Sequence, residues 1–466
     1  MSNLSSFQLS DHVDPDKIFL INLSDIDGRI DPIQFNSNRV AAIEKLSSNR
    51  ILTKLSKVTI SNSNKVDESD LVYVGLENIQ SHTGEYIFTQ DKNGFGSANI
   101  FNKGNILFPK LRPYLNKVYL AEFDGVCSTE FHVLDSKGNF LNEFLAIYLR
   151  SELILNQTKY LMTGNTLPRL QTKDIADLPV PVINLDIQKK IVDTHSSFMR
   201  ERSFKIQQAE NLLSSIDDYL LAELGIKVPD VDNSLPNRIF TVQASELSEP
   251  RLDPEYLAKK YRKMEDAVKN SLFNIQKLSD VTYLISSGKT PSKIDYVNDV
   301  SKHDKVYDII KVGSYSQDLI NSKKLDQTII APKFEVKKGD IFILSAAHQS
   351  EYVGKHIKFL NVNLDNVGCV GELICVRANN NIILNSYLFS ILKTDIFKTL
   401  INRRKTGQTS HVYPRDIRKI EVPVPNMTKQ QEIVEHIDHI RATAAQLQQE
   451  ANEILAQAKQ KIERMI

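Results

Sequence analysis

The sequence is internally repeated, since two segments about 240 residues apart share residues in a common register. The segment TGNTLPRLQTKDIADLPVPV, which starts at Thr163, is matched by TGQTSHVYPRDIRKIEVPVP, which starts at Thr406. Nine matched positions, from Asp174 and Asp416 to Val192 and Val434, are each 242 residues apart. A register shared over so many positions is hard to obtain by chance. The chain therefore contains two copies of one structural unit.

The repeat also extends upstream, and its extent predicts the domain boundaries. KGNI at Lys103 is matched by KGDI at Lys338, and LNEFL at Leu141 by LNSYL at Leu384. Residues 227–238 join the two copies and are rich in Pro, Asp and Asn, which is typical of a linker. We expect a first domain at 1–180 (core about 50–180), a long helix at 181–226, a second domain at 239–422 (core about 275–422) and a second long helix at 423–466.

Each copy combines a mixed body with one long helix, so the predicted fold class is α+β. The two bodies are predicted to be pseudo-symmetric α/β domains. Proline pairs close each body, and Asp186 and Thr428 are the expected caps of the helices that follow. The body patterns predict strands at Leu71–Leu76, Asn105–Phe108 and Asp340–Leu344, and helices at Asn142–Leu155 and Asn385–Ile401.

The two long helices carry apolar residues at alternating spacings of three and four, which is the seam of a coiled coil. Small alanines in the second seam suit close approach to larger residues in the first. We expect the helices to pair with each other, antiparallel by pseudo-two-fold symmetry. The alternative is an amphipathic helix that lies on its own body. The seam residues are Ile191, Phe198, Ile206, Leu213, Ile216, Leu220, Ile433, Ile437, Ile440, Leu447 and Ile454.

The bulk properties indicate an ordinary globular protein of a reducing compartment. Charged residues make up 25% of the chain, and no run of 18 apolar residues predicts a membrane span. The first residues lack the basic start and apolar core of a secretory signal. Three cysteines form no CxxC pair, so a cytoplasmic location is expected. The net charge of +1 argues modestly against nucleic-acid binding unless positive charge is concentrated locally.

Positive charge is indeed concentrated in one segment of the first body. Residues 99–121 hold four basic residues and no acid, centred on FPKLRPYLNK. Basic groups interleaved with an aromatic ring and an amide suit phosphate anchoring and base-edge contact. A solvated hairpin is the alternative. The candidate DNA contacts here are Lys110, Arg112, Tyr114, Asn116 and Lys117.

A second basic segment surrounds the repeated TGxT loop. Residues 392–419 carry eight basic residues against two acids. A hydroxyl–Gly–amide–hydroxyl loop offers backbone N–H groups at close approach, although a plain turn has the same sequence. The candidates from this segment and its first-copy equivalent are Thr163, Gly164, Asn165, Thr166, Arg169, Arg403, Arg404, Lys405, Thr406, Gly407, Gln408, Thr409 and His411.

The second body adds a further loop that only superficially resembles a nucleotide-binding motif. A P-loop requires a glycine at the position that Tyr283 occupies, so we interpret SGKT as a turn or a DNA-contact loop. The corresponding candidates are Ser287, Gly288, Lys289, Thr290, His348 and Gln349.

Catalytic and metal-binding signatures are missing from the sequence. It contains no GxGxxG, GxSxG or HExxH, and no Asn-Pro-Pro-aromatic motif of an amino-methyltransferase. His436 and His439 are three residues apart on a helix but have no evident third ligand. We therefore expect no catalytic residue, no metal site and no bound cofactor on this chain.

These residues together resemble a known family. TGNTLPRL…DI…VPV and TGQTSHVYPRDI…VPVP, each leading into a Gln-containing helix start (IQKKIV and KQQEIV), are similar to the specificity subunit of type I restriction-modification systems. One departure is that SHVY stands in the second copy where the first has LPR. The role of Arg169 therefore does not transfer directly.

The resemblance implies a function as well as an architecture. Each body would be a target-recognition domain that reads one half of a bipartite, asymmetric duplex site. The paired helices, through the seam residues named above, would set the gap and dock two methyltransferase subunits, which restriction/translocase subunits would join. S-adenosylmethionine, ATP and magnesium would bind to those partners, which methylate adenine.

Two other classes of function remain open from the sequence alone. A coiled-coil scaffold with two protein- or peptide-binding domains fits the near-neutral charge but not the basic TGxT loops. A self-sufficient nuclease or methyltransferase with a diverged site would have to turn over DNA without partners.

Overall fold

The chain is described from a computed structural model, which divides it into two compact units. Unit 1 comprises Met1–Ile206 and Gln448–Ile466, and unit 2 comprises Gln207–Leu447. The structure describes residues 9–10, 12–14, 17–18, 20–21, 32–62, 64–89, 96–164, 166–230, 232, 234–243, 253–297, 299, 301, 305–316, 319–320, 325–407 and 410–466. Each unit therefore contains one body and a part of both long helices.

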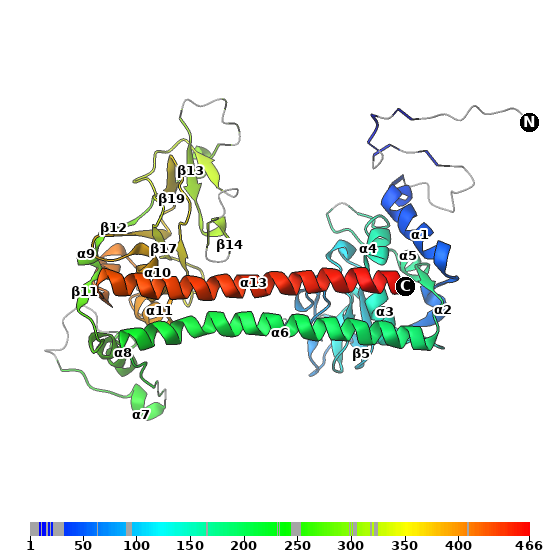
Figure 1. Cartoon of the computed structure of the whole chain (residues 1–466), viewed down its shortest axis with the longest axis horizontal. Helices are drawn as coiled ribbons and strands as arrows, with labels where there is room; N and C mark the ends of the chain where they lie inside the picture. The colour runs from blue at the N-terminus through cyan, green and yellow to red at the C-terminus, as the bar shows by residue number, and fades with distance from the viewer. Residues whose placement is uncertain are drawn as a thin grey trace, which may run out of the picture. The chain divides into compact units, whose positions relative to one another are not determined.

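Unit 1 has two small sheets, ordered β2-β9-β6-β7 and β3-β5-β8-β4, and the antiparallel pair β1-β10, which joins the two ends of the body. Its helices are η2 (Pro32–Phe35), α1 (Ser37–Asn49), α2 (Leu55–Val58), η3 (Leu76–Asn78), η4 (Pro113–Leu115), α3 (Asn142–Leu149), α4 (Glu152–Thr158) and α5 (Thr172–Ala176). Its strands are β1 (Leu52–Lys54), β2 (Thr59–Asn62), β3 (Lys65–Val66), β4 (Tyr73–Val74), β5 (Ala98–Phe101), β6 (Ile106–Pro109), β7 (Tyr119–Leu120), β8 (Gly125–Ser128), β9 (Phe131–Ser136) and β10 (Pro179–Pro181). The first long helix, α6 (Leu185–Leu224), follows β10 (Figure 1).

Unit 2 repeats this plan with a longer sheet, ordered β12-β20-β17-β18-β15-β14, beside a three-stranded sheet, β16-β13-β19, and the pair β11-β21. Its helices are α7 (Leu235–Arg238), α8 (Lys259–Lys269), α9 (Leu278–Val281), η6 (Lys293–Asp295), η8 (Val312–Ser314), α10 (Asn385–Lys393), α11 (Asp395–Asn402) and α12 (Pro414–Ile417). Its strands are β11 (Ile275–Lys277), β12 (Thr282–Ser287), β13 (Tyr307–Ile310), β14 (Tyr315–Ser316), β15 (Leu319–Ile320), β16 (Asp326–Thr328), β17 (Ile341–Leu344), β18 (Ile357–Phe359), β19 (Val367–Cys369), β20 (Leu373–Ala378) and β21 (Glu421–Pro423). The second long helix is α13 (Met427–Met465).

Strand pairing shows that the two bodies are copies of one fold. Leu107 pairs with Val133 in unit 1, and the matching Phe342 pairs with Cys375 in unit 2. The parallel pair β4-β8 of unit 1 has its counterpart in the parallel pair β13-β19 of unit 2. These findings confirm the predicted α+β class with two pseudo-symmetric bodies.

The apolar core of each unit includes residues that are distant in sequence. In unit 1, α3 is buried along most of its length, and Ile462 and Ile466 from the end of α13 pack into the same cluster. Arg50 donates to the carbonyl oxygen of Ile466 at 3.1 Å, which ties the C-terminus to the start of the body. In unit 2, Leu220 and Leu224 from the end of α6 occupy the corresponding place in the core.

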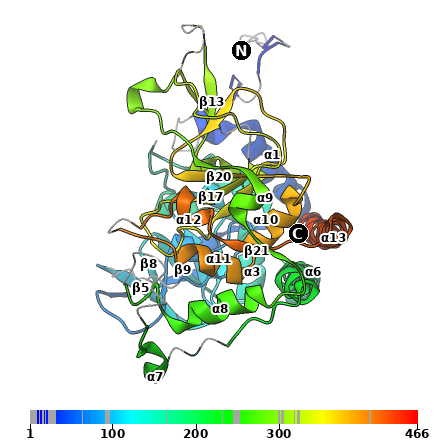
Figure 2. The ribbon, with the colours of Figure 1, turned by 90° about the vertical axis from the view of Figure 1, so that its left-hand side faces the viewer.

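The long helices run antiparallel in each unit. In unit 1, Lys205 lies 2.7 Å from Glu450, and Lys461 lies over the ring of Phe198. In unit 2, Glu223 pairs with Lys429. Higher-numbered positions of α6 thus meet lower-numbered positions of α13, as predicted, and Figure 2 shows the two helices end on as neighbouring coils. At 40 residues, α6 is about 60 Å long.

The start of each long helix is fixed by a buried glutamine. The side-chain carbonyl of Gln188 accepts from the Leu141 amide at 2.9 Å, and its NH₂ donates to the carbonyls of Asn139 and Ile183. Gln430 repeats this pattern with Leu384, Ile382 and Pro425. Both glutamines are fully buried, so these bonds clamp the helix to its body.

Three local predictions differ from the structure. The helix caps are Asn184 and Asn426, whose side chains accept from the amides of Ile187 and Lys429, rather than Asp186 and Thr428. Each predicted body helix is broken in two, because Ser151 and Thr394 adopt extended backbone and bond back to the preceding turn. The strand expected at Leu71–Leu76 is limited to Tyr73–Val74.

No helix in the described part of the chain is long and apolar enough to cross a membrane.

Candidate nucleic-acid interface

In unit 1, the two basic or glycine-containing loops predicted from the sequence lie side by side. The amide of Leu170 donates to the carbonyl of Lys110 at 2.9 Å, and the amide of Arg112 donates to that of Pro168 at 2.8 Å. Thr163 and Arg169 pair as an isolated β-bridge that closes the TGNT loop. Backbone pairing therefore joins segments 56 to 60 residues apart in the sequence into one surface beyond the end of β6.

The glycine of each TGxT loop has a left-handed backbone. Gly164 has φ +93° and Gly407 has φ +89°, values that favour glycine over residues with a Cβ atom. Thr406 and His411 close the second loop as Thr163 and Arg169 close the first. The predicted residues Asn165, Gln408 and Thr409 lie outside the described residues.

Arg169 forms a bidentate ion pair with Glu130, a residue that the sequence reasoning did not single out. Its Nε donates to Oε2 at 3.1 Å and its Nη2 to Oε1 at 2.8 Å. These hydrogen bonds lower the pKa of Glu130, as does the charge of Lys110, against the opposing effect of burial. Because Glu130 precedes β9 and Arg169 follows the TGNT loop, no local pattern in the sequence reveals the pair.

The other predicted residues of unit 1 separate into exposed and structural groups. Arg112 and Tyr114 are exposed, as are Gly164 and Thr166. Lys110 is half-buried, and that burial lowers its pKa. Asn116 is buried, and its side-chain NH₂ donates to the Arg150 carbonyl at 2.8 Å. This amide group therefore has a partner within the protein.

Lys117 has a similar internal contact. Its Nζ donates to the carbonyl of Leu76 at 2.7 Å, and burial lowers its pKa. With Asn116, it supports the fold of the FPKLRPYLNK segment. Asn116 is buried and Lys117 is half-buried, and the side-chain nitrogen of each donates to a backbone carbonyl.

Unit 2 builds an equivalent surface from different side chains. The amide of Val412 donates to the Ser345 carbonyl at 2.9 Å, and Ala346 bridges to His411. His348 and Gln349 follow directly and are exposed. The sequence register places His411 at the position that Arg169 occupies in unit 1, so the two surfaces share a backbone frame but present different chemistry.

The Ser287–Thr290 turn packs against this surface. A Cβ atom at Gly288 would lie 1.9 Å from the carbonyl oxygen of Cys369, so only glycine allows the approach. Thr290 donates to Glu372 at 2.8 Å and accepts from the Gly371 amide. A short 3-10 helix, Lys293–Asp295, follows the turn where a phosphate-binding loop would lead into an α-helix. Ser287 is half-buried, whereas Lys289 is exposed.

The sequence reasoning also missed a stacked group beside His411. The rings of His411 and Tyr413 are stacked with centroids 6.2 Å apart, and the Arg415 guanidinium lies over Tyr413. These residues fall in the basic segment 392–419 described above. Tyr413, an aromatic residue within that segment, was the sequence signal that could have indicated the stacked group. Aromatic rings and arginine side chains grouped on a basic surface are typical of nucleic-acid interfaces.

The basic cluster Arg403-Arg404-Lys405, predicted to contact DNA, has protein partners within unit 2. Arg403 is buried, donates to the Tyr256 carbonyl at 2.7 Å and pairs with Glu265 at 2.6 Å. Arg404 lies 3.9 Å from the same carboxylate, and Lys405 donates to Asn402. The sequence shows the positive charge but not the long-range partners that neutralise it, so Arg403 supports the body of unit 2.

The seam residues of the long helices are mostly inaccessible. Leu213 is exposed and Phe198, Ile206, Ile216 and Leu447 are half-buried. The fully or nearly fully buried seam residues are Ile191, Leu220, Ile433, Ile437, Ile440 and Ile454. They hold the helices and the bodies together, which leaves the outward helix faces for any partner.

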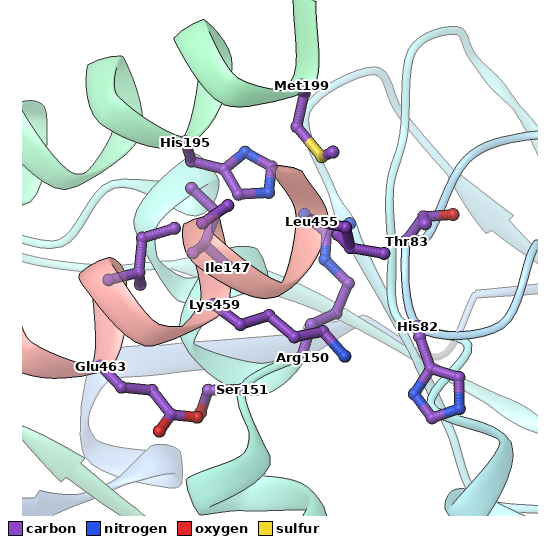
Figure 3. Close-up of a pocket in the computed structure, with 12 residues that line it drawn as sticks. His82, Thr83, Ile147, Arg150, Ser151, His195, Met199, Leu455, Lys459 and Glu463 are labelled. Carbon is purple, nitrogen blue, oxygen red and sulfur yellow. The ribbon is translucent and has the colours of Figure 1, made fainter. Parts of the chain in front are cut away.

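A small cavity in unit 1 lies where the body meets both helices. Figure 3 shows His195 and Met199 of α6, Lys459 of α13 and Arg150 at its wall. Its volume is about 30 Å³, enough for roughly one water molecule. Burial lowers the pKa of Arg150 to about 10 and, with the Arg150 charge, that of His195 to about 4.

Metal-binding geometry is also not found in the described residues, where no three His, Cys, Asp or Glu side chains are placed to hold an ion. The ring of His436 instead packs on Tyr219 of α6 with centroids 4.0 Å apart.

Sequence comparison identifies the family. The profile of the family described as Type I restriction modification DNA specificity domain matches residues 49–212 and 270–456, about three quarters of the chain. The chain belongs to this family. The two matched ranges coincide with the two copies of the repeat, and the match confirms the prediction of a non-catalytic DNA-specificity role.

Individual relatives are more distant. The type I restriction enzyme EcoDI specificity subunit of Escherichia coli is 28% identical over 156 residues, which cover 33% of this chain and 35% of that protein. A solved structure from work on complex assembly and conformational transition of the type I R-M system is 19% identical. It covers 89% of this chain and 96% of its own, with a TM-score of 0.51, and supports the fold alone. The crystal structure of the HsdS subunit from Thermoanaerobacter tengcongensis, 17% identical over 90% and 96% of the two chains, has a TM-score of only 0.36.

Proposed function

We propose that this chain reads a bipartite, asymmetric duplex site and directs adenine methyltransferase and restriction subunits to it. The observation that carries the proposal is the repeated surface at the end of β6 and β17. Each copy joins a TGxT loop to the segment after an equivalent strand. Backbone amides, hydroxyl groups and basic side chains on such a surface suit phosphate contact, and the side chains that differ suit base selection.

The difference between the two surfaces supports an asymmetric site. Arg112, Tyr114 and Arg169 stand in unit 1, whereas His348 and His411 stand in unit 2. Because arginine and histidine offer different donors to base edges, the two half-sites are expected to differ in sequence.

The antiparallel helices support a fixed spacing between the half-sites. A helix pair held by buried seam residues resists bending, so the number of its turns would set the gap. We also propose that the outward faces of these helices dock two methyltransferase subunits. Phe204, which is not one of the seam residues, is a large apolar residue exposed on α6.

The cofactors are proposed to reside on the partners. S-adenosylmethionine would bind to the methyltransferase subunits, and ATP and magnesium to a restriction/translocase subunit. We also propose the domain boundaries expected from the sequence, in which each domain ends where a long helix begins. We propose a cytoplasmic location for this chain, which fits a genomic DNA target. It also fits the three buried cysteines, which form no disulfide.

Two measurements test the proposal. The chain should be isolated with its bound subunits from the source cells, and methylated adenines should be mapped in the genome. A two-part motif with a fixed gap, lost when this chain is deleted, is the expected result. Duplex affinity of the isolated complex should also fall steeply with salt. Affinity that is independent of salt, together with no change in methylation, would favour the protein scaffold instead.

A further inference from the structure

The Arg169–Glu130 pair uses only one side of the guanidinium. The carboxylate engages Nε and Nη2, which point to the same side of the planar group. Arg carries five N–H donors in a fixed arrangement. Of the three remaining donors, one on Nη1 and one on Nη2 form a second, end-on pair. Among the residues that the structure describes, no other group accepts from this guanidinium, and the side chain is 44% exposed.

The backbone of Arg169 is held as firmly as its side chain. Its amide donates to Thr163 at 2.9 Å, and its carbonyl accepts from the Thr163 amide at 2.8 Å. On either side of it, the Pro168 carbonyl accepts from the Arg112 amide, and the Leu170 amide donates to the Lys110 carbonyl. A donor pair fixed by both its backbone and a carboxylate loses little conformational freedom when it binds.

We propose that Arg169, held by Glu130, reads a guanine in the half-site bound by unit 1. Glu130 is the positioning residue, and the end-on donor pair of Arg169 meets the O6 and N7 acceptors of guanine in the major groove. This inference rests on the proposed function, because it requires that unit 1 contacts the duplex.

Charge favours a base over a phosphate as the ligand. The ion pair is neutral overall, and the Glu130 carboxylate lies within 2.8 Å of the guanidinium. A phosphate at the end-on donors would be attracted by the arginine and repelled by the nearby carboxylate. Guanine presents two neutral acceptors, so it gains the bidentate geometry without that repulsion.

Unit 2 lacks this arrangement although it retains the carboxylate. Glu372 occupies the place of Glu130, since the Ser345 amide bonds to its carbonyl as the Lys110 amide bonds to that of Glu130. The Glu372 side chain accepts from Thr290, and His411 stands at the position of Arg169. The guanine-reading pair is therefore specific to unit 1, and Glu372 provides a matched control.

The test measures discrimination at each position of the site. The complex with its partner subunits would carry Glu130→Gln, Arg169→Lys or the control Glu372→Gln. Binding and methylation would be measured on duplexes substituted one base pair at a time. Wild-type protein should prefer guanine at one position of the unit 1 half-site by about 5- to 150-fold, the range for a bidentate pair. Arg169→Lys keeps the charge but loses the planar pair of donors, so it should weaken that preference more than it weakens binding to other duplexes.

Glu130→Gln should have two opposite effects. The preference for guanine at that position should weaken, because the arginine loses its ionic partner. Affinity for all duplexes should rise, because a carboxylate facing the phosphates is removed. A purely structural role would not combine these effects. Glu372→Gln should leave discrimination at that position unchanged.

Several outcomes would overturn the inference. A uniform loss of affinity in Arg169→Lys, with guanine preference retained, would make Arg169 a phosphate contact. Full retention of guanine preference in both unit 1 variants would exclude a base contact. A wild-type complex without any sequence preference would instead overturn the proposed function itself. Arg169 is exposed, so Arg169→Lys is expected to fold and serves if Glu130→Gln does not.

Discussion

Replacing one of two adjacent glutamines on α13 tests whether the buried amide clamps the helix to unit 2. Gln430 is fully buried and makes three hydrogen bonds to backbone groups of the body and the preceding loop. Gln431 is exposed, and its side chain donates only to Glu435, one turn away on the same helix. Gln430→Leu and Gln431→Leu make the same chemical change at neighbouring positions of one helix.

The expected magnitude follows from the groups left without partners. Gln430→Leu deprives the Leu384 amide and the carbonyls of Ile382 and Pro425 of their side-chain partner. Each buried unsatisfied group costs about 1–3 kcal/mol, and local relaxation recovers a part. We expect a loss of about 3 kcal/mol, which lowers the unfolding temperature of a unit of this size by roughly 6–12 °C. Gln431→Leu should change stability by less than about 0.5 kcal/mol.

Calorimetry and urea unfolding of the full chain measure both variants. Gln188→Leu provides a second comparison, because Gln188 makes the same three types of hydrogen bond in unit 1. It should destabilise unit 1 by a similar amount. Equal, small shifts in Gln430→Leu and Gln431→Leu would refute the idea that the buried amide fastens the helix to the body.

Three further predictions concern charge. Arg403→Ala should destabilise unit 2 by about 3 kcal/mol, because it leaves Glu265 without its buried partner. The duplex affinity of the folded protein should not change. Urea unfolding measures the first effect and binding titrations measure the second. Arg112→Ala should weaken binding to all duplexes alike and reduce the slope of log affinity against log salt by about 1 in salt titrations. Because burial and Arg150 lower the pKa of His195 to about 4, His195 stabilises the fold above its unfolded pKa of about 6.5. That contribution, up to about 3 kcal/mol, should be lost as pH falls from 6.5 to 4 and should be missing in His195→Gln, as unfolding at several pH values would show.

The architecture could be predicted from the sequence because its signals are regular and local. Nine matched positions that are each 242 residues apart reveal two copies of one unit. The seam of Ile433, Ile437 and Ile440 predicts a paired helix. The Gln-containing helix starts were visible too, although their role as clamps required the structure. Such patterns persist because each position of a repeat or seam meets the same environment, which restricts the residue type.

Tertiary structure alone decided which charged residues are available for binding. Arg403 and Arg169 look alike in the sequence, each in or near a TGxT loop. The fold buries Arg403 against Glu265, whereas the Arg169 side chain is exposed and uses only two of its five N–H donors on Glu130. The physical reason is that an ion pair forms between residues far apart in the chain. Sequence shows a charge, whereas only the folded backbone shows which opposite charge comes within hydrogen-bonding distance of it.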